Sequence, residues 1–227
     1  MKKRLKIDGF LSVILAIVLI YLARLFYRPK GKILDYALDI IGIIVVVFGQ
    51  ILRISGRNYK KQHSGQGSAL ITDGPYSLVR NPMYLGTFLM GVGFVTILWP
   101  WWFLLIFAGI FYLRFKNLIL SEESKLSEIF GKSYKEYKQS VPCFFLSIAR
   151  LVQLPKYLPL KWKWLKKELP VILAWFLLVA IIKGLVEKMD FFSREYLAEL
   201  AVLSIALIAT FGFFSPILIR DGPKQKS

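Results

Sequence analysis

The stretch YALDIIGIIVVVFGQILRI, residues 36–54, decides the fold, because it is almost entirely apolar over the length of a membrane span. A transmembrane helix needs about 20 consecutive, mostly apolar residues. Comparable stretches recur along the rest of the chain, at residues 9–27, 84–99, 101–119, 169–187 and 196–219. The sequence therefore predicts an all-α fold, a polytopic transmembrane helix bundle of about six spans.

Composition supports the membrane assignment. Of the 227 residues, 56% are hydrophobic, and the mean hydropathy is +0.54, whereas soluble domains contain about 45–50% apolar residues. The third and fourth stretches are joined only at Trp99-Pro100-Trp101, which is long enough for a tight turn and nothing more. We therefore expect these two helices to form an antiparallel hairpin. Residues 1–60 then form the N-terminal transmembrane helices, and residues 168–227 form a C-terminal transmembrane pair.

The formal net charge of +17, from 31 basic against 14 acidic residues, sets the orientation. Lys and Arg accumulate in the cytoplasmic loops of membrane proteins. With the N-terminus in the cytoplasm, 24 of the 31 basic residues lie on the cytoplasmic side, and the opposite orientation reverses this ratio. We expect a multi-pass integral membrane protein with both termini in the cytoplasm. In a soluble protein such a charge would suggest nucleic-acid binding. Here the topology accounts for it, so the expected partner is the lipid bilayer and not a nucleic acid.

Residues 146–167 combine basic side chains with Trp162 and Trp164, a pattern typical of the lipid headgroup region. We expect an interfacial segment there that leads into the fifth span. Cys143 and His63 are each the single residue of their type in the chain. A lone cysteine followed by two phenylalanines favours a small buried apolar residue. The sequence predicts neither a disulfide nor a metal site.

Residues 65–86, GQGSALITDGPYSLVRNPMYLG, form a polar loop that the expected topology places in the cytoplasm. Pro82 suits the first turn of the helix that follows, whose unpaired N–H groups and positive dipole end attract a carboxylate or another anion. Arg80 adds a guanidinium that can form a fork-shaped pair with a carboxylate, and Tyr76 and Tyr84 add aromatic faces and hydroxyls. The alternative is that Arg80 anchors the topology and that the tyrosines belong to an aromatic belt.

Residues 117–142, NLILSEESKLSEIFGKSYKEYKQSVP, predict a cytoplasmic amphipathic helical segment under the bundle. Ser121 is suited to the N-cap, which places Glu122 and Glu123 in the first turn, and Gly131 permits a bend between two short helices. The two acids fit the cationic or hydroxyl groups of a nucleotide-like ligand. The alternative is that they only balance the helix dipole. Because the hairpin returns the chain to the side it left, we expect both polar segments to meet in one pocket at the cytoplasmic boundary.

Two motifs in these segments resemble the isoprenylcysteine carboxyl methyltransferase family and its phospholipid methyltransferase relatives. The first is L-I-T-x-G-P-Y-x-x-x-R-N-P-x-Y-x-G, Leu70 to Gly86, and the second is E-E-x-x-L…F-G-x-x-Y-x-x-Y-x-x-x-V-P, Glu122 to Pro142. The resemblance implies that residues 61–145 form a methyltransferase core. It also implies S-adenosylmethionine as the cofactor, bound in a cytoplasmic pocket, and a lipophilic small molecule or lipid as the substrate, which enters from the bilayer.

The same resemblance assigns the site residues. The cofactor-binding residues that it implies are Tyr76, Asn81, Pro82, Tyr84, Glu122 and Glu123, and the catalytic residues are Arg80 and Arg114. Three places depart from the family pattern. Ser68 stands before the L-I-T run, where eukaryotic members have a histidine. Asn81 stands where many members have a histidine, and an asparagine cannot titrate. Prenylcysteine-type members have an arginine just before the acidic pair, where this chain has Asn117 and Leu118, with Arg114 a turn earlier.

Methyl transfer from a sulfonium is an in-line displacement that depends mainly on alignment and on the exclusion of water. A carboxylate acceptor is ionised at neutral pH and needs no base, whereas an amine or an ordinary thiol must first lose a proton. The residues above include no dedicated base, which favours a carboxylate or an acidic thiol. The resemblance implies a prenylcysteine-like carboxylate as one such acceptor, although the departures above argue against it. The alternatives are a phospholipid N-methyltransferase, a sterol-reductase-like protein that uses NADPH, and a non-catalytic membrane protein that retains the motifs. The acidic second motif argues against the reductase.

Overall fold

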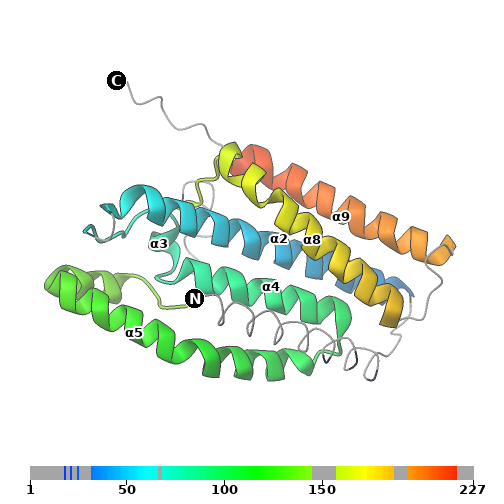
Figure 1. The fold of residues 1–227 in the computed structure, drawn as a ribbon, viewed down its shortest axis with the longest axis horizontal. Coiled ribbons are helices and arrows are strands. Elements are labelled where there is room, and N and C mark those ends of the chain that lie inside the picture. Colours follow the sequence, from blue (N-terminus) through cyan, green and yellow to red (C-terminus); the bar gives the residue numbers. More distant parts are fainter. Residues whose placement is uncertain are drawn as a thin grey trace, which may run out of the picture.

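The computed structural model describes residues 32–65, 68–144, 157–186 and 194–218, together with the isolated helical positions 18, 21 and 25. In these parts of the chain the regular elements are helices, which form an elongated bundle (Figure 1). In chain order they are α2 (Lys32–His63), α3 (Pro75–Leu78), α4 (Pro82–Leu98), α5 (Phe103–Ser140), α8 (Trp162–Val186) and α9 (Arg194–Leu218). The all-α prediction is confirmed for the described residues.

Three stretches are long and apolar enough, by length and composition, to cross a membrane: Ile33–His63, Phe103–Ser140 and Trp162–Leu185. Pro82–Leu98 and Leu200–Thr210 are apolar but shorter. The span predicted at residues 9–27 falls almost wholly outside the described residues. The structure thus supports a multi-pass membrane protein and gives three candidate spans within its described part.

Glycines at seven-residue spacing bring α2 and α4 into backbone contact. A Cβ added to Gly49 would lie 2.6 Å from the carbonyl oxygen of Gly86, and one added to Gly93 would lie 2.5 Å from that of Gly42. Small residues let two membrane helices approach this closely, so that van der Waals contact between backbones replaces side-chain packing. The pairing of an early glycine of α2 with a late glycine of α4 makes the two helices antiparallel, with α2 at the centre of the bundle (Figure 1).

The predicted hairpin between α4 and α5 is confirmed. α4 ends at Leu98 and α5 begins at Phe103, and the turn is closed by a bond from the Phe103 N–H to the Pro100 carbonyl, 3.0 Å. α4 also begins at Pro82, as expected, because a proline lacks only an N–H that the first turn leaves unpaired.

The predicted N-cap at Ser121 is wrong, since α5 passes through this residue without interruption. Between Phe103 and Gly131 the sequence has no proline and is rich in residues that favour helix, so nothing ends the helix at the membrane boundary. Gly131 does produce the expected bend: its φ of 49° and ψ of −116° kink α5, a conformation that glycine adopts at little cost. The acidic pair therefore lies deep inside a helix, where the dipole of a first turn cannot explain it.

α9 packs against α2, and α8 contacts both α2 and α4 (Figure 1). α8 begins seven residues before the predicted span at 169, and its Trp164 is buried in the core of the bundle. A hydrogen bond of 2.8 Å from the Ser55 hydroxyl to the Pro159 carbonyl and a buried ion pair between Asp39 and Lys183 join this region to α2. Residues 146–156 of the expected interfacial segment lie outside the described residues.

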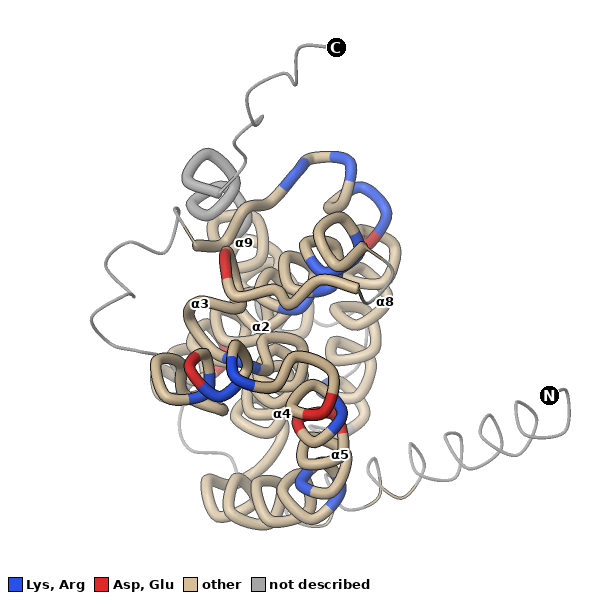
Figure 2. Tube along the Cα trace, turned by 90° about the vertical axis from the view of Figure 1, so that its left-hand side faces the viewer, with Lys and Arg blue, Asp and Glu red and all other residues tan. Residues whose placement is uncertain are grey.

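Charged side chains gather at one end of the bundle. Figure 2 looks onto this end, where the C-terminal part of α2, the second half of α5 and the beginning of α8 carry many lysines and arginines. Because a cytoplasmic surface is rich in basic residues, the two motif segments lie at the end that charge predicts to be cytoplasmic.

Candidate active site

The first motif is held between α2 and α5 by α3. Gly74, with φ of 57°, starts this short helix and packs so closely on Tyr59 that an added Cβ would lie 2.8 Å from the ring. The Tyr76 hydroxyl donates to the Gly56 carbonyl at 3.4 Å, and the Tyr137 hydroxyl donates to the Tyr76 carbonyl at 2.6 Å. Burial raises the pKa of Tyr76 well above its usual value, so the hydroxyl stays neutral. The hydroxyl and the carbonyl of Tyr76 are thus both bonded to other residues of the protein, to Gly56 of α2 and Tyr137 of α5.

Arg80 joins the two motifs. Its N–H donates to the Pro142 carbonyl at 2.9 Å, and its Nη1 donates to the Lys138 carbonyl at 3.1 Å. Its Nε lies 3.2 Å from Oε1 of Glu123, and the side chains of both residues are 8% exposed. The expectation that the two segments meet in one place is confirmed. Arg80 and Glu123, which are 43 positions apart in sequence, form a buried ion pair. An arginine that only anchored the topology would not need such a partner.

The Arg80–Glu123 pair leaves one hydrogen-bonding group unused. Arg80 Nε, although near the carboxylate, is buried without an aligned hydrogen bond to any described residue. The other carboxylate oxygen of Glu123 lies 3.5 Å from the Lys138 ammonium. A buried charge pair is costly unless further hydrogen bonds satisfy it. An unsatisfied buried donor needs an explanation, and a bound ligand, a water or an ion can each complete its bonding.

Glu122 differs from its neighbour. It accepts a hydrogen bond of 2.8 Å from the Tyr84 hydroxyl and forms no ion pair with any basic residue in the described ranges. Tyr84 comes from the first turn of α4, just after Asn81 and Pro82. The acidic pair therefore offers one carboxylate that is neutralised and one that is free to accept a cation.

Cys143, which the sequence favours as an apolar core residue, lies instead at the centre of this cluster and is half-buried. Its thiol donates to Oε1 of Glu123 at 3.4 Å, and the Asn81 side-chain amide donates to its sulfur at 3.5 Å and to its carbonyl at 3.2 Å. Pro82, the first residue of α4, is fully buried. The only sequence signal for Cys143 is its position directly after Pro142, where the second motif ends.

A cavity of about 430 Å³ adjoins the cluster between α4 and α5. Cys143 and Phe144 line it at the chain segment that follows α5, and Phe88 faces it from α4. Several of its aromatic rings are in contact with one another, including Phe88 with Phe144 at 5.4 Å between ring centres. The remaining lining residues come from α5: Ala108, Phe111, Tyr112, Phe115, Lys116, Ile119 and Leu120. An apolar cavity with charged groups beside it suits a ligand with a lipophilic body and a polar end.

Arg114 is not part of the Arg80–Glu123 cluster. It lies on the exposed side of α5, and its guanidinium carbon is 5.7 Å from the ring centre of Phe115. Its neighbours Phe115 and Lys116 line the cavity, whereas Arg114 does not. Of the predicted site residues, the structure brings Arg80, Asn81, Tyr84, Glu122 and Glu123 together around Pro82. It places Tyr76 in the scaffold beneath them and Arg114 outside.

Comparison with known proteins agrees with this geometry. The phospholipid methyltransferase family matches residues 36–133, from α2 to just beyond the kink in α5. The protein-S-isoprenylcysteine O-methyltransferase of Dictyostelium discoideum is 34% identical over 124 residues, which are 51% of this chain and 52% of that protein. The protein-S-isoprenylcysteine O-methyltransferase B of Arabidopsis thaliana is 30% identical over 133 residues, which are 55% of this chain and 67% of that protein. The chain belongs to the isoprenylcysteine methyltransferase family.

The human member of this family is 31% identical over 124 residues, 51% of this chain and 43% of that protein. The chain therefore spans about half the length of the family members that it matches. The region matched to the phospholipid methyltransferases includes both glutamates and Arg80, but it ends before Cys143 and before α8 and α9. No solved structure matches the chain.

Proposed function

We propose that the chain is an integral membrane methyltransferase that uses S-adenosylmethionine and acts on a lipophilic acceptor. The observation that carries this proposal is the buried Arg80–Glu123 pair, with 3.2 Å between the charged atoms, beside a cavity of about 430 Å³. The family relationship supplies the reaction class, and the cluster supplies groups of the right kind. A topology anchor or a packing motif needs neither a buried ion pair with an unused donor nor a cavity beside it.

The donors and acceptors of the cluster fit S-adenosylmethionine, which when bound supplies a methyl group on a cationic sulfonium. Its α-ammonium needs an anionic partner, and Glu122 is the glutamate of the pair that has no ion-pair partner among the described residues. Its carboxylate needs a donor, and Arg80 has a buried Nε without an aligned hydrogen bond. Asn81 can bind hydroxyl groups, since its amide both donates and accepts. Glu123 holds Arg80 in place.

The acceptor that the cavity favours has an apolar body, because the lining is almost entirely aromatic and aliphatic. A carboxylate at its polar end is attracted by Lys138 of the cluster and by Lys116 of the cavity lining, and it needs no base before it attacks the methyl group. The cavity residues Phe88 and Phe144 would exclude water from this end. The matched proteins are named for prenylcysteine methylation, so a prenylcysteine-like carboxylate is the first acceptor to test.

A phospholipid amine is the second candidate acceptor, since the family that matches residues 36–133 is described as phospholipid methyltransferase. Incubation of the purified protein with methyl-labelled cofactor, a prenylcysteine analogue and phosphatidylethanolamine separates the two. The primary proposal predicts label in a base-labile ester of the prenylcysteine. Label in methylated phosphatidylethanolamine would select the alternative, and no label in any lipid-soluble product would contradict both.

The six-span topology, with both termini and the site in the cytoplasm, belongs to the same proposal. It is supported by the clustering of basic residues at the end of the bundle that carries Arg80 (Figure 2). Single cysteines introduced next to Lys2 and next to Lys224, in a Cys143→Ser background, should both react with a membrane-impermeant reagent only after the cytoplasmic side is opened. Labelling from opposite sides would overturn the topology.

A further inference from the structure

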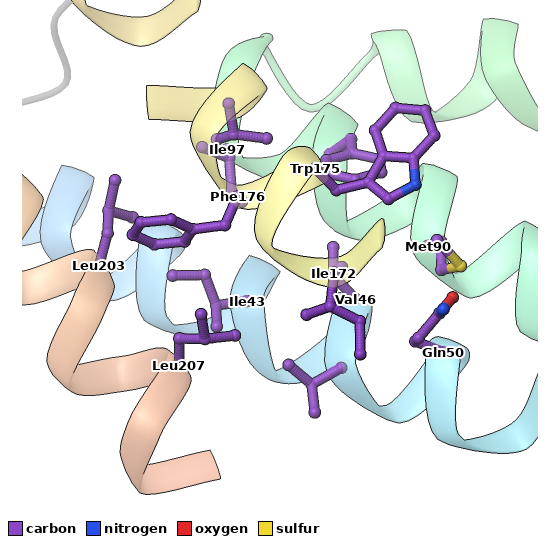
Figure 3. A pocket seen from close by; sticks show the side chains of 13 residues that line it. Ile43, Val46, Gln50, Met90, Ile97, Ile172, Trp175, Phe176, Leu203 and Leu207 are labelled. Atoms are coloured by element: carbon purple, nitrogen blue, oxygen red, sulfur yellow. The ribbon is translucent and has the colours of Figure 1, made fainter. Parts of the chain in front are cut away.

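A second cavity lies on the other side of α4 from the candidate active site, between α2, α4, α8 and α9 (Figure 3). Its volume is about 40 Å³, and it is partly open. All of its lining residues are apolar or aromatic except Gln50 of α2. α8 and α9 lie outside the segment matched to the phospholipid methyltransferases, so the cavity is made jointly by the matched core and by helices added to it.

Gln50 is unusual among the buried polar side chains of the bundle. It is 3% exposed, and neither its Nε2 nor its Oε1 has a hydrogen-bond partner among the described residues. On the same helix, Ser55 bonds to the Pro159 carbonyl and Asp39 pairs with Lys183. An unpaired amide inside an apolar span is strongly unfavourable, because no solvent there can replace the missing bonds. The Gln50 carboxamide would therefore be satisfied by a bound group that both donates and accepts hydrogen bonds.

Water is a poor candidate for that group. A buried water usually makes about three hydrogen bonds and needs 2–4 polar partners. In this cavity Gln50 offers a water two hydrogen bonds, one fewer than usual, and apart from the Trp175 indole nitrogen and the Met90 sulfur the remaining lining is hydrocarbon. Cavities lined by hydrocarbon tend to stay dry.

A hydroxyl group on an apolar tail satisfies both parts of the cavity. The hydroxyl donates to Oε1 of Gln50 and accepts from Nε2, while the tail lies against the apolar lining. A carbonyl or ester only accepts and leaves Oε1 unpaired. An ionised carboxylate, phosphate or ammonium would be buried without a counter-ion, because no charged residue lines the cavity.

We propose that this cavity binds the hydroxyl end of a membrane alcohol, an uncharged amphiphile with a long hydrocarbon tail. Figure 3 shows Gln50 and Met90 at one end of the cavity and Leu203, Phe176 and Ile97 toward the other. From Gln50 to Ile43, α2 rises about 10 Å, which gives the tail an apolar path along the helix before it continues into the bilayer. The site is separate from the Arg80–Glu123 cluster, and the proposal does not depend on methyl transfer.

The test uses the full chain in phosphatidylcholine nanodiscs, because this lipid has no free hydroxyl. The probe is a hexadecanol with a photoactivatable diazirine in its tail, and cross-linked peptides are identified by mass spectrometry. We expect labelling of the α2 segment 43–50 or the α8 segment 172–179, and competition by hexadecanol but not by hexadecane. Gln50→Leu should weaken the competition by about tenfold, since two hydrogen bonds are lost. Met90→Leu, a change of similar volume at the same end, should leave it unaltered.

Thermal unfolding provides the second readout. Hexadecanol should raise the midpoint of the wild-type protein and of Met90→Leu, and it should not raise that of Gln50→Leu. The Gln50→Leu variant should itself fold, because the change removes an unpaired amide. Equal labelling and equal stabilisation in Gln50→Leu, or displacement of the probe by hexadecane as effectively as by hexadecanol, would overturn the proposal. So would labelling confined to other segments.

Discussion

The two sides of α4 are built in opposite ways. Toward α2 the backbones touch at Gly86 and Gly93, where an added Cβ would meet a carbonyl oxygen of α2 at 2.5 Å. Toward α5, aromatic side chains such as Phe88 hold the helices apart around a cavity of about 430 Å³. On the α2 side backbone meets backbone, whereas on the α5 side the contacts are made by side chains, such as Phe107 against Gly91, and they leave a cavity beside them. The difference indicates that the α2–α4 pair is the rigid support and that α5 completes the site.

The largest effect is expected from the charged pair beside the cavity. Arg80→Ala and Glu123→Gln should each weaken the binding of S-adenosylmethionine by about 2–5 kcal/mol, more than tenfold, because each leaves a buried partner charge unpaired. Calorimetric titration of the cofactor into detergent-solubilised protein measures this. Glu136→Gln is the matched control, since Glu136 lies on the same helix in an exposed pair with Lys132.

Glu136→Gln should keep the affinity of the wild-type protein, and all three variants should retain its helical circular dichroism. If Arg80→Ala and Glu123→Gln also bound the cofactor like the wild-type protein, the pair would be structural and the packing alternative would gain support.

On the glycine side, the expected effect is on stability. Gly49→Ala should lower the free energy of unfolding by about 1–3 kcal/mol, because the new methyl group meets backbone atoms of α4 that cannot move aside. Gly109 of α5 provides the comparison, since an added Cβ there has no neighbour within 4 Å. Gly109→Ala should stabilise by up to about 1 kcal/mol through helix propensity. Chemical unfolding in mixed micelles compares the two, and equal changes would refute the contrast between the two sides.

A smaller effect is expected at Glu122. Tyr84→Phe removes the hydroxyl that bonds to its carboxylate at 2.8 Å, a contribution of about 0.5–1.5 kcal/mol. Cofactor affinity should fall by up to about tenfold, with little change in the unfolding midpoint. Unchanged affinity together with a lower midpoint would mean that the tyrosine supports α5 and does not orient the carboxylate.

The smallest effect is expected for Cys143→Ser. Serine keeps a donor for Glu123 and an acceptor for Asn81, so cofactor affinity should change by less than about 1 kcal/mol. Reaction of the wild-type thiol with a bulky maleimide should nevertheless block transfer, because Cys143 lines the cavity. Full transfer activity after complete modification would place the acceptor elsewhere.

The features that the sequence predicts are those encoded locally. Trp99-Pro100-Trp101 is too short for anything but a turn, and the hairpin it makes brings Arg80 to Glu123. The predicted N-cap at Ser121 is wrong because the preference of serine for a cap is weaker than the tendency of the surrounding sequence to continue the helix. The resemblance assigns both motif glutamates to the expected cofactor site, but it does not distinguish their roles. Only the structure shows that Glu123 is neutralised by Arg80 and Lys138, while Glu122 has no ion-pair partner among the described residues.

Features that depend on register between distant helices are not predicted. The seven-residue spacing of Gly42, Gly49 and Gly56 is visible in the sequence, but its meaning depends on the antiparallel partner α4. Cys143 reaches Glu123 only because the kink at Gly131 turns the end of α5 back toward the cluster. Gln50 is one polar residue in an apolar run, and only the packing of α8 and α9 leaves its amide unpaired.

The central claim is that a methyl group is transferred beside Glu123, and radiolabel transfer tests it most directly. Wild-type, Glu123→Gln and Glu136→Gln proteins are incubated with methyl-labelled S-adenosylmethionine and a farnesylcysteine analogue, and label extracted into organic solvent is counted. Wild type and Glu136→Gln should give the same rate, and Glu123→Gln should be slower by more than about tenfold. Equal rates in all three proteins would contradict the claim.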